Sequence, residues 1–429
     1  MTEKLYEKFL KCSGVSTDTR QIKSGNMFFA LRGPNFNANQ FASEALEKGA
    51  SWVVIDEAAY RSDPRHILVE DALKALQELA IFHRRRFKIP FIGITGSNGK
   101  TTTKELVNCV LSAKYNTVAT TGNLNNHIGV PLTVLSVNDE TEIAIIEMGA
   151  NKPGDIKELC DIANPTHGVI TSIGKAHIEG FGSLEGVLKT KTELFDHLLK
   201  NNGKVFINSS NRIFANMIRR FEDPVLYPGE NDFYHARLVK SDPYVTYQNE
   251  SGKTVDTNLI GSYNFDNIAA ALCIGKFFGV EEKAANKAIA AYVPANMRSQ
   301  VIRKGSNTII LDAYNANPGS MEAALQTLSA MPEKRKVAIL GDMLELGDIT
   351  EDEHASIGRL TSALKIDEVY LCGVLMSFGH AGNPDARYFR DKKSLEEFLD
   401  SRKFENAAIL VKASRGMQLE TVNNHIHTT

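Results

Sequence analysis

The fold of this chain is decided by the segment Gly93-Ile94-Thr95-Gly96-Ser97-Asn98-Gly99-Lys100-Thr101-Thr102. An apolar run, residues 90–95, leads into its glycines, and a helical pattern follows them. Such a glycine turn presents backbone N–H groups to phosphate, while a lysine adds charge at the β- and γ-phosphates and a hydroxyl ligates Mg²⁺. Lys100 and Thr101 stand where these two side chains belong, although Ile94 replaces the glycine of the usual GxxxxGK(S/T) spacing. The segment predicts a phosphate-binding loop; a strand–turn–helix junction with an incidental lysine is the alternative.

The residues after this loop alternate between strand-like and helical patterns. Apolar runs stand at 144–148, 168–173 and 204–208. A helical pattern covers Pro153–Ala163, with Asn151 as a possible cap. This alternation predicts βαβ units and a parallel sheet. Residues 221–258 change to a polar alternation that favours a small antiparallel excursion, and a helical stretch over 265–291 follows.

Two further blocks flank this central one. The first begins with an amphipathic helix, has strands at 27–31 and 52–55, and ends in a helix over 71–86. Its terminal basic run, residues 83–86, is expected to be a solvated helix C-terminus. In the third block, four strand-like runs separated by helical segments predict a smaller open α/β sheet. These runs stand at 308–312, 336–341, 368–373 and 407–412.

The length agrees with this division into three blocks. At roughly 150 residues per domain, 429 residues predict about three domains, which we place at 1–88, 89–297 and 298–429. With 49 Lys and Arg against 51 Asp and Glu, the formal net charge of -2 argues against a global electrostatic attraction to nucleic acid or anionic membrane. Any phosphate chemistry must therefore come from local motifs.

The cysteines and the N-terminal residues predict the compartment. The five cysteines form no CxxC pair, which favours buried thiols in a reducing compartment over disulfides or a zinc site. The first twenty residues interleave charged and apolar positions, unlike a signal peptide, and no apolar run approaches 18 residues. We therefore expect a cytoplasmic protein without membrane insertion.

Seven further motifs follow the phosphate loop in a characteristic order. They are 122–131 (GNLNNHIGVP), 147–151 (EMGAN), 176–183 with 189–191, 261–267 (GSYNFDN), 312–318 (DAYNANP), 340–347 (LGDMLELG) and 412–417 (KASRGM). Together with TGxxGKTT they resemble the Mur ligases, which are related to the folylpolyglutamate synthases, over nearly the full length. Within that family, DAYNANP and LGDMLELG are most similar to the members that add D-alanyl-D-alanine to a UDP-N-acetylmuramoyl-tripeptide.

The resemblance implies both an architecture and a reaction. The architecture is the three-domain α/β Mur ligase arrangement: a small UDP-precursor domain, a central P-loop-type parallel-sheet ATPase domain and a C-terminal Rossmann-like domain for the dipeptide. The reaction is peptide ligation through an acyl phosphate, with ATP and Mg²⁺ as cofactors and a monomeric enzyme that binds no nucleic acid. The alternatives are another amino-acid ligase of this fold, such as a polyglutamylating enzyme, and a non-catalytic nucleotide-binding regulator.

The resemblance also implies roles for individual residues around the phosphates. Lys100 would bind the β- and γ-phosphates, Thr101 the first Mg²⁺, and Glu147 with His177 a second. Glu147 ends an apolar strand, where open α/β sheets bind ligands. Lys191 would be carbamylated and would help to organise the metal, with Lys189 as a rival for that role. The expected catalytic residues are Lys100, Glu147, His177, Lys191 and Arg298.

Further nucleotide and substrate contacts are expected by the same resemblance. The cofactor-binding residues would be Gly96, Ser97, Asn98, Gly99, Lys100, Thr101, Thr102, Asn264, Asn267, Arg298 and Asp312. The substrate-binding residues would be Ser16, Arg20, Asn125, Asn126, Ser183, Asn315, Asn317, Lys412, Ser414 and Arg415. The alternatives are helix caps for the asparagines and surface ion pairs for Arg20 and Arg298. Tyr263 replaces a histidine common in the family, and Asn37 and Asn39 depart from its uridine motif. A hinge is expected near 293–298.

Overall fold

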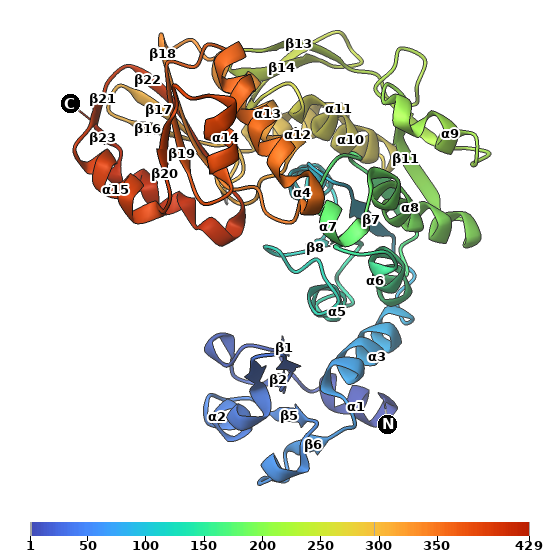
Figure 1. Ribbon diagram of the computed structural model, residues 1–429. Helices are drawn as coiled ribbons and strands as arrows, with labels where there is room; N and C mark the ends of the chain where they lie inside the picture. Colours follow the sequence, from blue (N-terminus) through green and yellow to red (C-terminus); the bar gives the residue numbers. More distant parts are fainter. Residues whose placement is uncertain (1, 296, 429) are drawn as a thin grey trace.

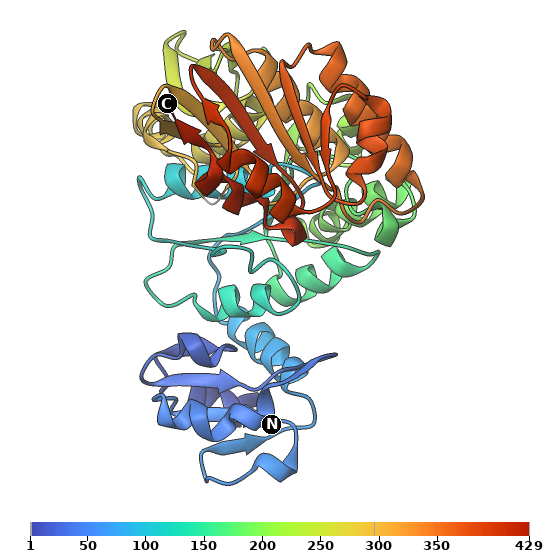
Figure 2. The same cartoon turned by 60° about the vertical axis from the view of Figure 1, so that its left-hand side comes forward.

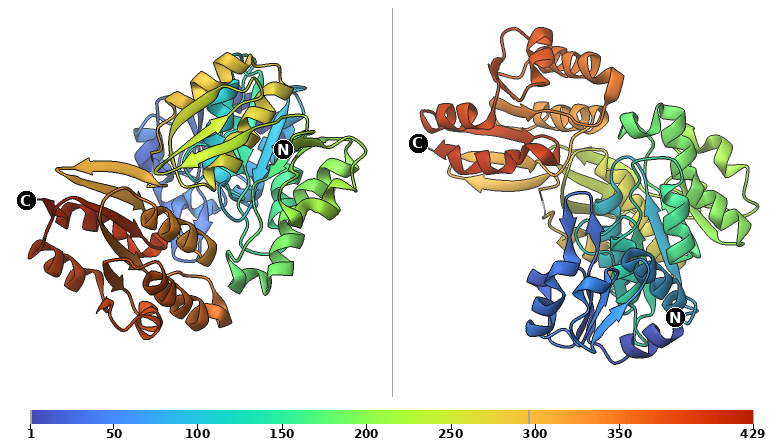
Figure 3. Two further views of the ribbon diagram at one scale, coloured as in Figure 1. Left: turned by 90° about the horizontal axis from the view of Figure 1, so that it is seen from above. Right: turned by 60° about the horizontal axis from the view of Figure 1, so that its bottom comes forward.

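The computed structural model describes residues 2–295 and 297–428. It contains three α/β units that follow one another along the chain (Figure 1). The first unit lies on one side of the central unit and the third on another (Figure 2). Seen from above and from below, the third unit stands to one side of the other two (Figure 3). The expected three-domain α/β architecture is confirmed.

A sheet of six parallel strands forms the central unit, in the order β12-β11-β10-β7-β9-β8. The strands are β7 (Phe91–Thr95), β8 (Thr117–Ala119), β9 (Ile143–Glu147), β10 (His167–Ile170), β11 (Lys204–Asn208) and β12 (Val225–Tyr227). After β7 the chain builds one side of the sheet with β8 and β9 and then crosses to the other side with β10. This change of direction opens a crevice at the carboxyl ends of β7, β9 and β10.

Helices cover both faces of this sheet because apolar side chains alternate along its strands. Ile92 and Ile94 of β7 pack in one apolar cluster with α4 and α10, whereas Phe91 packs in another with α5, α6 and α8. The helices are α4 (Lys100–Leu111), α5 (Gly129–Leu135), α6 (Asp155–Ala163), α7 (Ile178–Phe181), α8 (Leu184–Lys200), α9 (Ala215–Ile218), α10 (Asn264–Phe277) and α11 (Glu282–Ala291). The expected antiparallel excursion is confirmed as β13 (Arg237–Ser241), β14 (Tyr244–Gln248) and β15 (Thr254–Ile260).

Two helix boundaries expected from the sequence are wrong. Helix α6 begins at Asp155, two residues after Pro153, because Gly154 takes a left-handed N-cap conformation with φ +89°. The stretch 265–291 is two helices rather than one, since Gly279 at φ +69° ends the first of them.

The first unit is a sheet of four parallel strands in the order β1-β2-β5-β6. The strands are β1 (Gly14–Ser16), β2 (Asn26–Phe29), β5 (Trp52–Ile55) and β6 (His66–Leu68), and the helices are α1 (Thr2–Phe9), α2 (Ala42–Glu47) and α3 (Ala72–Arg84). A two-stranded hairpin, β3 (Arg32–Gly33) and β4 (Phe36–Asn37), extends from it. Leu76 and Leu79 of α3 share an apolar cluster with Val130 and Val134 of α5, which joins this unit to the central one.

Only the second half of the basic run at the end of α3 is solvated as expected. His83 and Arg84 are buried. Arg84 donates to the carbonyl oxygens of Ala163 and Asn164 at 2.7 and 2.9 Å. It therefore provides hydrogen-bond donors to the carbonyl oxygens at the C-terminal end of α6. Its guanidinium also lies 3.7 Å from the ring centroid of Phe91. Burial lowers the pKa of Arg84 to about 10. The first half of the run therefore joins two units, whereas Arg85 and Arg86 are exposed as expected.

The third unit is a six-stranded sheet in the order β16-β17-β22-β18-β19-β20, parallel except for β16. Its strands are β16 (Gln300–Lys304), β17 (Asn307–Asp312), β18 (Arg335–Gly341), β19 (Glu368–Cys372), β20 (Arg387–Phe389) and β22 (Ala407–Lys412). Its helices are α12 (Pro318–Ser329), α13 (Thr350–Ala363), α14 (Met376–Gly382) and α15 (Lys392–Asp400). In the register of β17 with β22, Asp312 lies opposite Lys412.

Two further properties concern the helices and the cysteines. Within residues 2–295 and 297–428, no helix is both long and apolar enough to cross a membrane. All five cysteines are free thiols, and Cys160, Cys273 and Cys372 are buried.

Candidate active site

A cavity of about 930 Å³ lies between the central and third units. Its lining in the central unit includes the loop after β7, Glu147 at the end of β9 and His177 ahead of α7. From the third unit come Asp312 at the end of β17 and Lys412 at the end of β22. The carboxyl ends of two open sheets thus face one space, which is where such sheets bind ligands.

Two glycines let the loop after β7 approach its neighbours closely. Gly96 has φ +149°, and a β-carbon there would lie 2.1 Å from Oγ1 of Thr171. Gly99 has φ +81°, and a β-carbon there would lie 2.4 Å from Oδ1 of Asn267. Both positions therefore require glycine, as a loop that wraps a phosphate does.

The backbone amides of this loop divide into two groups. Ser97 N donates to Ser172 O at 2.8 Å and Asn98 N donates to Ser172 Oγ at 2.9 Å, so these two amides are engaged within the protein. Helix α4 begins after Gly99, which has no side chain to cap it. The N–H groups of the first helical turn, 100–102, lack partners within the helix and face the end of the cavity. This turn is the available anion site.

Lys100 lies folded back on the same loop. Its Nζ donates to the carbonyl oxygens of Gly96 and Ser97 at 2.7 and 3.1 Å. Burial lowers the pKa of Lys100 to about 8, an effect that the Glu147 carboxylate opposes. A phosphate beside the ammonium would replace these neutral carbonyls with an anion and would favour the charged lysine.

Two oxygens next to this lysine fit a divalent cation. Among the described residues, Oγ1 of Thr101 and Oε2 of Glu147 are buried and have no hydrogen-bond partner. The other carboxylate oxygen of Glu147 accepts from Nδ2 of Asn125 at 2.7 Å. Hard cations such as Mg²⁺ prefer oxygen ligands of this kind. The described part of the chain has no cluster of three or more His, Cys, Asp or Glu that could hold a metal, so this centre would also need a hydroxyl and a modified lysine.

His177 reaches the same cavity from the loop that follows β10. It adopts a left-handed conformation with φ +53° at the start of α7. Its ring lies edge-on to Phe181, with 6.4 Å between centroids. Its Nδ1 contacts the carboxylate of Glu345 in the third unit.

Lys191 is buried in α8, whereas Lys189 is exposed. Nζ of Lys191 lies 3.4 Å from the carbonyl oxygen of Ala150, a residue of the cavity wall. Burial, reinforced by the charge of Lys100, lowers the pKa of Lys191 well below its usual value. Burial therefore favours the neutral amine, which is the form that reacts with CO₂, and favours Lys191 over its rival.

The two asparagines of α10 line the cavity beside Gly99. Asn267 Nδ2 donates to Asn264 Oδ1 at 2.9 Å, and its own Oδ1 accepts from Thr103 Oγ1 at 3.0 Å. Asn264 in turn donates to the carbonyl oxygen of Ile260 at 2.8 Å. These bonds fix the orientation of both amides at the cavity surface.

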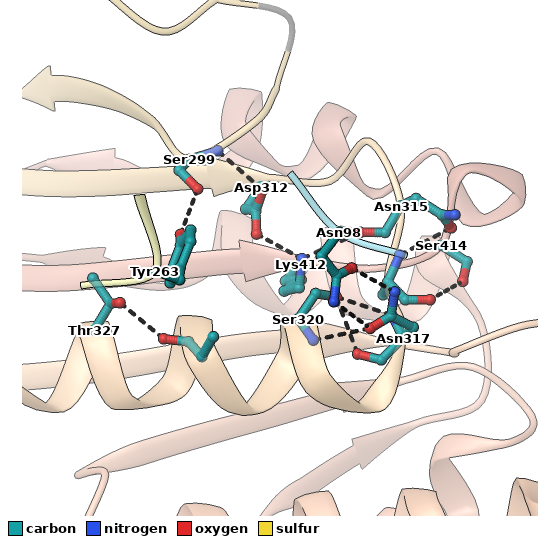
Figure 4. Close-up of polar contacts among 12 residues, drawn as sticks. Asn98, Tyr263, Ser299, Asp312, Asn315, Asn317, Ser320, Thr327, Lys412 and Ser414 are labelled. Atoms are coloured by element: carbon teal, nitrogen blue, oxygen red, sulfur yellow. Dashed lines mark hydrogen bonds and ion pairs between the residues drawn. The ribbon is translucent and has the colours of Figure 1, made fainter. Parts of the chain in front are cut away.

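Arg298 and Asp312 occupy the hinge side of the cavity. The Arg298 guanidinium lies 3.7 Å from the ring centroid of Tyr314. Asp312 binds Lys412 across 2.5 Å and accepts from the backbone N of Ser299 at 2.9 Å (Figure 4). Tyr263, which replaces the family histidine, shares a hydrogen bond of 2.8 Å with Ser299 Oγ (Figure 4).

Asn98 and Asn317 form a direct bond between the phosphate loop and the third unit. Nδ2 of Asn317 donates to Oδ1 of Asn98 at 2.8 Å (Figure 4). Oδ1 of Asn317 accepts from Ser320 N at 2.9 Å, and Ser320 Oγ accepts from Asn317 N, which completes a capping box on α12. Asn315, also in the cavity wall, accepts from the N of Ala316. The helix cap expected as an alternative is therefore present at Asn317.

The other expected substrate residues are distributed over all three units. Asn126 lines the cavity and accepts from Gly129 N at 2.9 Å, whereas Ser183 caps α8 and lies outside it. Ser16 and Arg20 are in the first unit, where Arg20 pairs with Asp18 at 2.7 Å. In the third unit, Ser414 accepts from Leu344 N at 2.9 Å, and Arg415 pairs with Glu420 at 2.9 Å; neither lines the cavity.

The two departures from the uridine motif have structural roles. Asn39 is buried, donates to Asp56 Oδ1 at 2.8 Å and accepts from Asp56 N at 3.0 Å. Asn37 donates to Glu57 Oε1 at 3.0 Å. These side chains hold the hairpin against the end of β5.

Sequence reasoning missed Glu345 and Ser172. Glu345 lies inside the LGDMLELG motif, but only the three-dimensional structure brings it to His177. Ser172 follows β10 and carries no motif of its own; its contact with Asn98 depends on the parallel pairing of β10 with β7.

Three family models match consecutive parts of the chain. They are the Mur ligase family catalytic domain over residues 11–84, the Mur ligase middle domain over 94–275 and the Mur ligase glutamate ligase domain over 297–415. Among named relatives, the UDP-N-acetylmuramoyl-tripeptide–D-alanyl-D-alanine ligase of Bacillus subtilis is 37% identical to this chain. The match covers 95% of this chain and 92% of the relative. The ligase of the same name from Escherichia coli is 34% identical over 95% and 92%.

Solved structures are similar to the whole chain as well. A crystal structure of MurF from Acinetobacter baumannii has a TM-score of 0.86 at 28% identity, covering 99% of this chain and 98% of the other. MurF ligase from Thermotoga maritima in complex with ADP has a TM-score of 0.84 at 27% identity, covering 97% of each.

Proposed function

This chain belongs to the Mur ligase family, and we propose that it is the ATP-dependent ligase that joins UDP-N-acetylmuramoyl-tripeptide to D-alanyl-D-alanine. The products are ADP, phosphate and the UDP-linked pentapeptide precursor of peptidoglycan. The observation that carries the proposal is that one cavity brings the phosphate loop, Glu147 and His177 together with Asp312 and Lys412. Relatives with this activity in their names match the chain over nearly its full length.

The reaction requires activation of a carboxylate, because a carboxylate is a poor electrophile. Transfer of the γ-phosphoryl group of ATP to the tripeptide carboxylate gives an acyl phosphate. The amine of the dipeptide then attacks the acyl carbon and phosphate leaves. Both partners in the first step are anions, so the site must neutralise charge and align the reacting oxygens.

We assign the triphosphate to the first turn of α4. The amides of 100–102 would donate to the β-phosphate, and Nζ of Lys100 would exchange the carbonyls of Gly96 and Ser97 for the β- and γ-phosphate oxygens. Arg298 would approach the γ-phosphate from the hinge. Thr101, Glu147, His177 and carbamylated Lys191 would hold Mg²⁺, which when bound neutralises phosphate charge.

The remaining cavity residues would orient the two substrates. Asn264 and Asn267 line the adenine side, and Asp312 would accept from ribose hydroxyls. Lys412, the cation nearest to Asp312, would then bind the carboxylate of the dipeptide, with Asn315 next to it. Asn125 positions Glu147 and, with Asn126, borders the path of the tripeptide.

The first unit would hold the UDP end of the precursor, with Ser16 and Arg20 as contacts. We therefore propose residues 1–88 as the UDP-precursor domain, 89–297 as the ATP-binding domain and 298–429 as the dipeptide-binding domain. The cavity lies between the last two, so their contact would keep water from the acyl phosphate. We further propose that the enzyme acts in the cytoplasm, where ATP is available and its free thiols remain reduced, and that it is a monomer.

Phosphate release tests this function. The purified chain should release phosphate from ATP with UDP-N-acetylmuramoyl-tripeptide and D-alanyl-D-alanine together, and Lys100→Ala should abolish it. Omission of the dipeptide should reduce release to a small background, because the acyl phosphate then has no amine acceptor. Release that ignored the dipeptide would contradict the proposed function.

A further inference from the structure

The contact between His177 and Glu345 joins the two units at the edge of the cavity. His177 has φ +53° and Glu345 has φ +65°, so both residues hold a left-handed backbone that is unfavourable for non-glycine residues. Such conformations persist where the surrounding structure requires them, and they cluster at functional sites. The structures of both units therefore hold these two residues in the conformations that make the contact.

The surroundings of the pair hold each partner in place. The edge-on ring of Phe181 restricts the imidazole plane. The backbone carbonyl oxygen of Glu345 accepts from Glu179 N at 3.2 Å, which fixes the Glu345 backbone against the start of α7. The side-chain carboxylate of Glu345 contacts Nδ1 of His177 directly.

An anionic acceptor at one ring nitrogen determines the chemistry of the other. When Nδ1 carries the proton that it donates to a carboxylate, Nε2 keeps a lone pair and can ligate a cation. A carboxylate in this position also fixes the orientation of the imidazole. Because His177 and Glu147 line the same cavity, such a lone pair would serve the cation that the free carboxylate oxygen of Glu147 fits.

We propose that Glu345 is a positioning residue that accepts the Nδ1 proton of His177 and thereby presents Nε2 to the divalent cation of the phosphate site. This inference rests on the proposed role of His177 as a metal ligand. Since Glu345 belongs to the third unit, the metal site of the central unit is complete only when the third unit is docked. The third unit, which would bind the dipeptide, therefore also completes the metal site that would activate the tripeptide carboxylate.

A second ion pair in the same interface provides a matched control. Lys175 of the central unit pairs with Glu353 of α13 at 2.6 Å. Like Glu345, Glu353 docks the third unit on the loop after β10, but it does not touch His177. Loss of Glu353 weakens docking alone, whereas loss of Glu345 also frees the imidazole.

Manganese binding to the full chain tests the inference. The protein is saturated with a non-hydrolysable ATP analogue and UDP-N-acetylmuramoyl-tripeptide, Mn²⁺ is titrated, and coupling to ¹⁵N-labelled histidine is followed by electron paramagnetic resonance. Glu345→Gly removes the carboxylate while glycine accepts φ +65° without strain. We expect it to weaken the histidine-coupled Mn²⁺ site by about 10- to 100-fold. Glu345→Gln keeps an acceptor for Nδ1–H and should restore most of the affinity. Glu353→Gln should weaken the site less than Glu345→Gly does, because it loosens docking but leaves Glu345 against His177.

The other outcomes separate the inference from the proposed function. Unchanged affinity and coupling in Glu345→Gly, with coupling lost in His177→Ala, would overturn the role of Glu345 alone. Equal weakening in Glu345→Gly and Glu353→Gln would reduce the contact to docking and would also overturn it. Histidine coupling that survives His177→Ala would refute the metal role of His177 and the inference together.

Discussion

Burial of basic side chains sets the chemistry of single residues in the central unit. Lys191 has lost its hydration, which lowers its pKa and favours the free amine. We expect this amine to form a carbamate with ¹³C-bicarbonate, visible as a ¹³C resonance in the intact protein. Lys191→Arg should remove the resonance and reduce activity by about 10- to 100-fold.

Lys189 provides the control for this prediction. It lies two residues away on the exposed face of α8, so Lys189→Arg should keep both the resonance and the activity. A carbamate signal that persisted in Lys191→Arg would exclude Lys191 as the modified residue.

His167, at the start of β10, is a half-buried base. It packs among Phe206, Phe277 and Phe278, and burial lowers its pKa to about 4. The unfolded chain takes up this proton near pH 6.5 and the folded chain only near pH 4, so acidification through that window favours unfolding. Between pH 7 and pH 4 this proton uptake should lower the free energy of unfolding by up to about 3 kcal/mol. We expect His167→Gln to abolish this part of the decrease. Urea unfolding at both pH values checks this; equal losses in both proteins would contradict it.

At the scale of elements, two helix N-termini allow a matched test of the phosphate loop. Gly99 and Gly154 precede α4 and α6 with φ +81° and +89°. A β-carbon on Gly99 would overlap Asn267, whereas one on Gly154 would meet no atom within 4 Å. Both alanine variants carry the same backbone strain of about 1–2 kcal/mol. We expect Gly99→Ala alone to abolish binding of a fluorescent ATP analogue; normal binding would show that the loop tolerates the displacement.

Helix α12 permits a second test through its capping box. Asn317→Ala removes both the cap and the bond to Asn98, whereas Ser320→Ala breaks the capping box and leaves that bond. Each should destabilise the protein by about 1 kcal/mol in thermal unfolding. Only Asn317→Ala should also raise the KM for ATP, by about threefold to tenfold, since a hydrogen bond contributes about 1 kcal/mol. An equal KM in both variants would show that the Asn98 contact has no part in nucleotide binding.

The elements differ in how far the sequence predicts them. Strands β11 and β22 have the expected bounds because each contains a continuous apolar run inside a parallel sheet. The three-residue strands β1 and β6 were not predicted, since their pairing and not their composition makes them strands. Phosphate-loop residues are contiguous and carry a motif. The bond of Asn98 to Asn317 joins residues 219 positions apart and depends on how two units dock, which no local pattern encodes.

At the scale of the whole molecule, the two outer units are attached to the central one differently. An apolar cluster through Leu76 and Val130, together with buried Arg84, joins the first unit to it. The third unit contacts it through the polar pairs Asn317–Asn98, Glu345–His177 and Glu353–Lys175, and through Ile260 of β15, which is buried in the third unit's apolar cluster. Polar contacts that water can replace break more easily than a buried apolar surface.

The segment between the central and third units has the properties of the expected hinge. Val293 is exposed, and Met297 and Ser299 have φ of +58° and +50° on either side of Arg298; position 296 lies outside the described residues. We expect single-molecule energy transfer between dyes on the central and third units to change when an ATP analogue and the UDP-tripeptide are added. Dyes on the first and central units should report a constant distance. A change confined to the first unit would contradict this assignment of the moving part.

The rigid attachment of the first unit has a consequence for which precursors are accepted. If the uridine end binds there, Arg84 and α3 fix how far that anchor lies from the phosphate loop. The uridine site and the phosphate loop are then a fixed distance apart. Only a peptide of matching length therefore places its terminal carboxylate beside the γ-phosphate. A precursor one residue shorter would bind yet leave the carboxylate out of reach, so length selection would appear in turnover rather than in affinity.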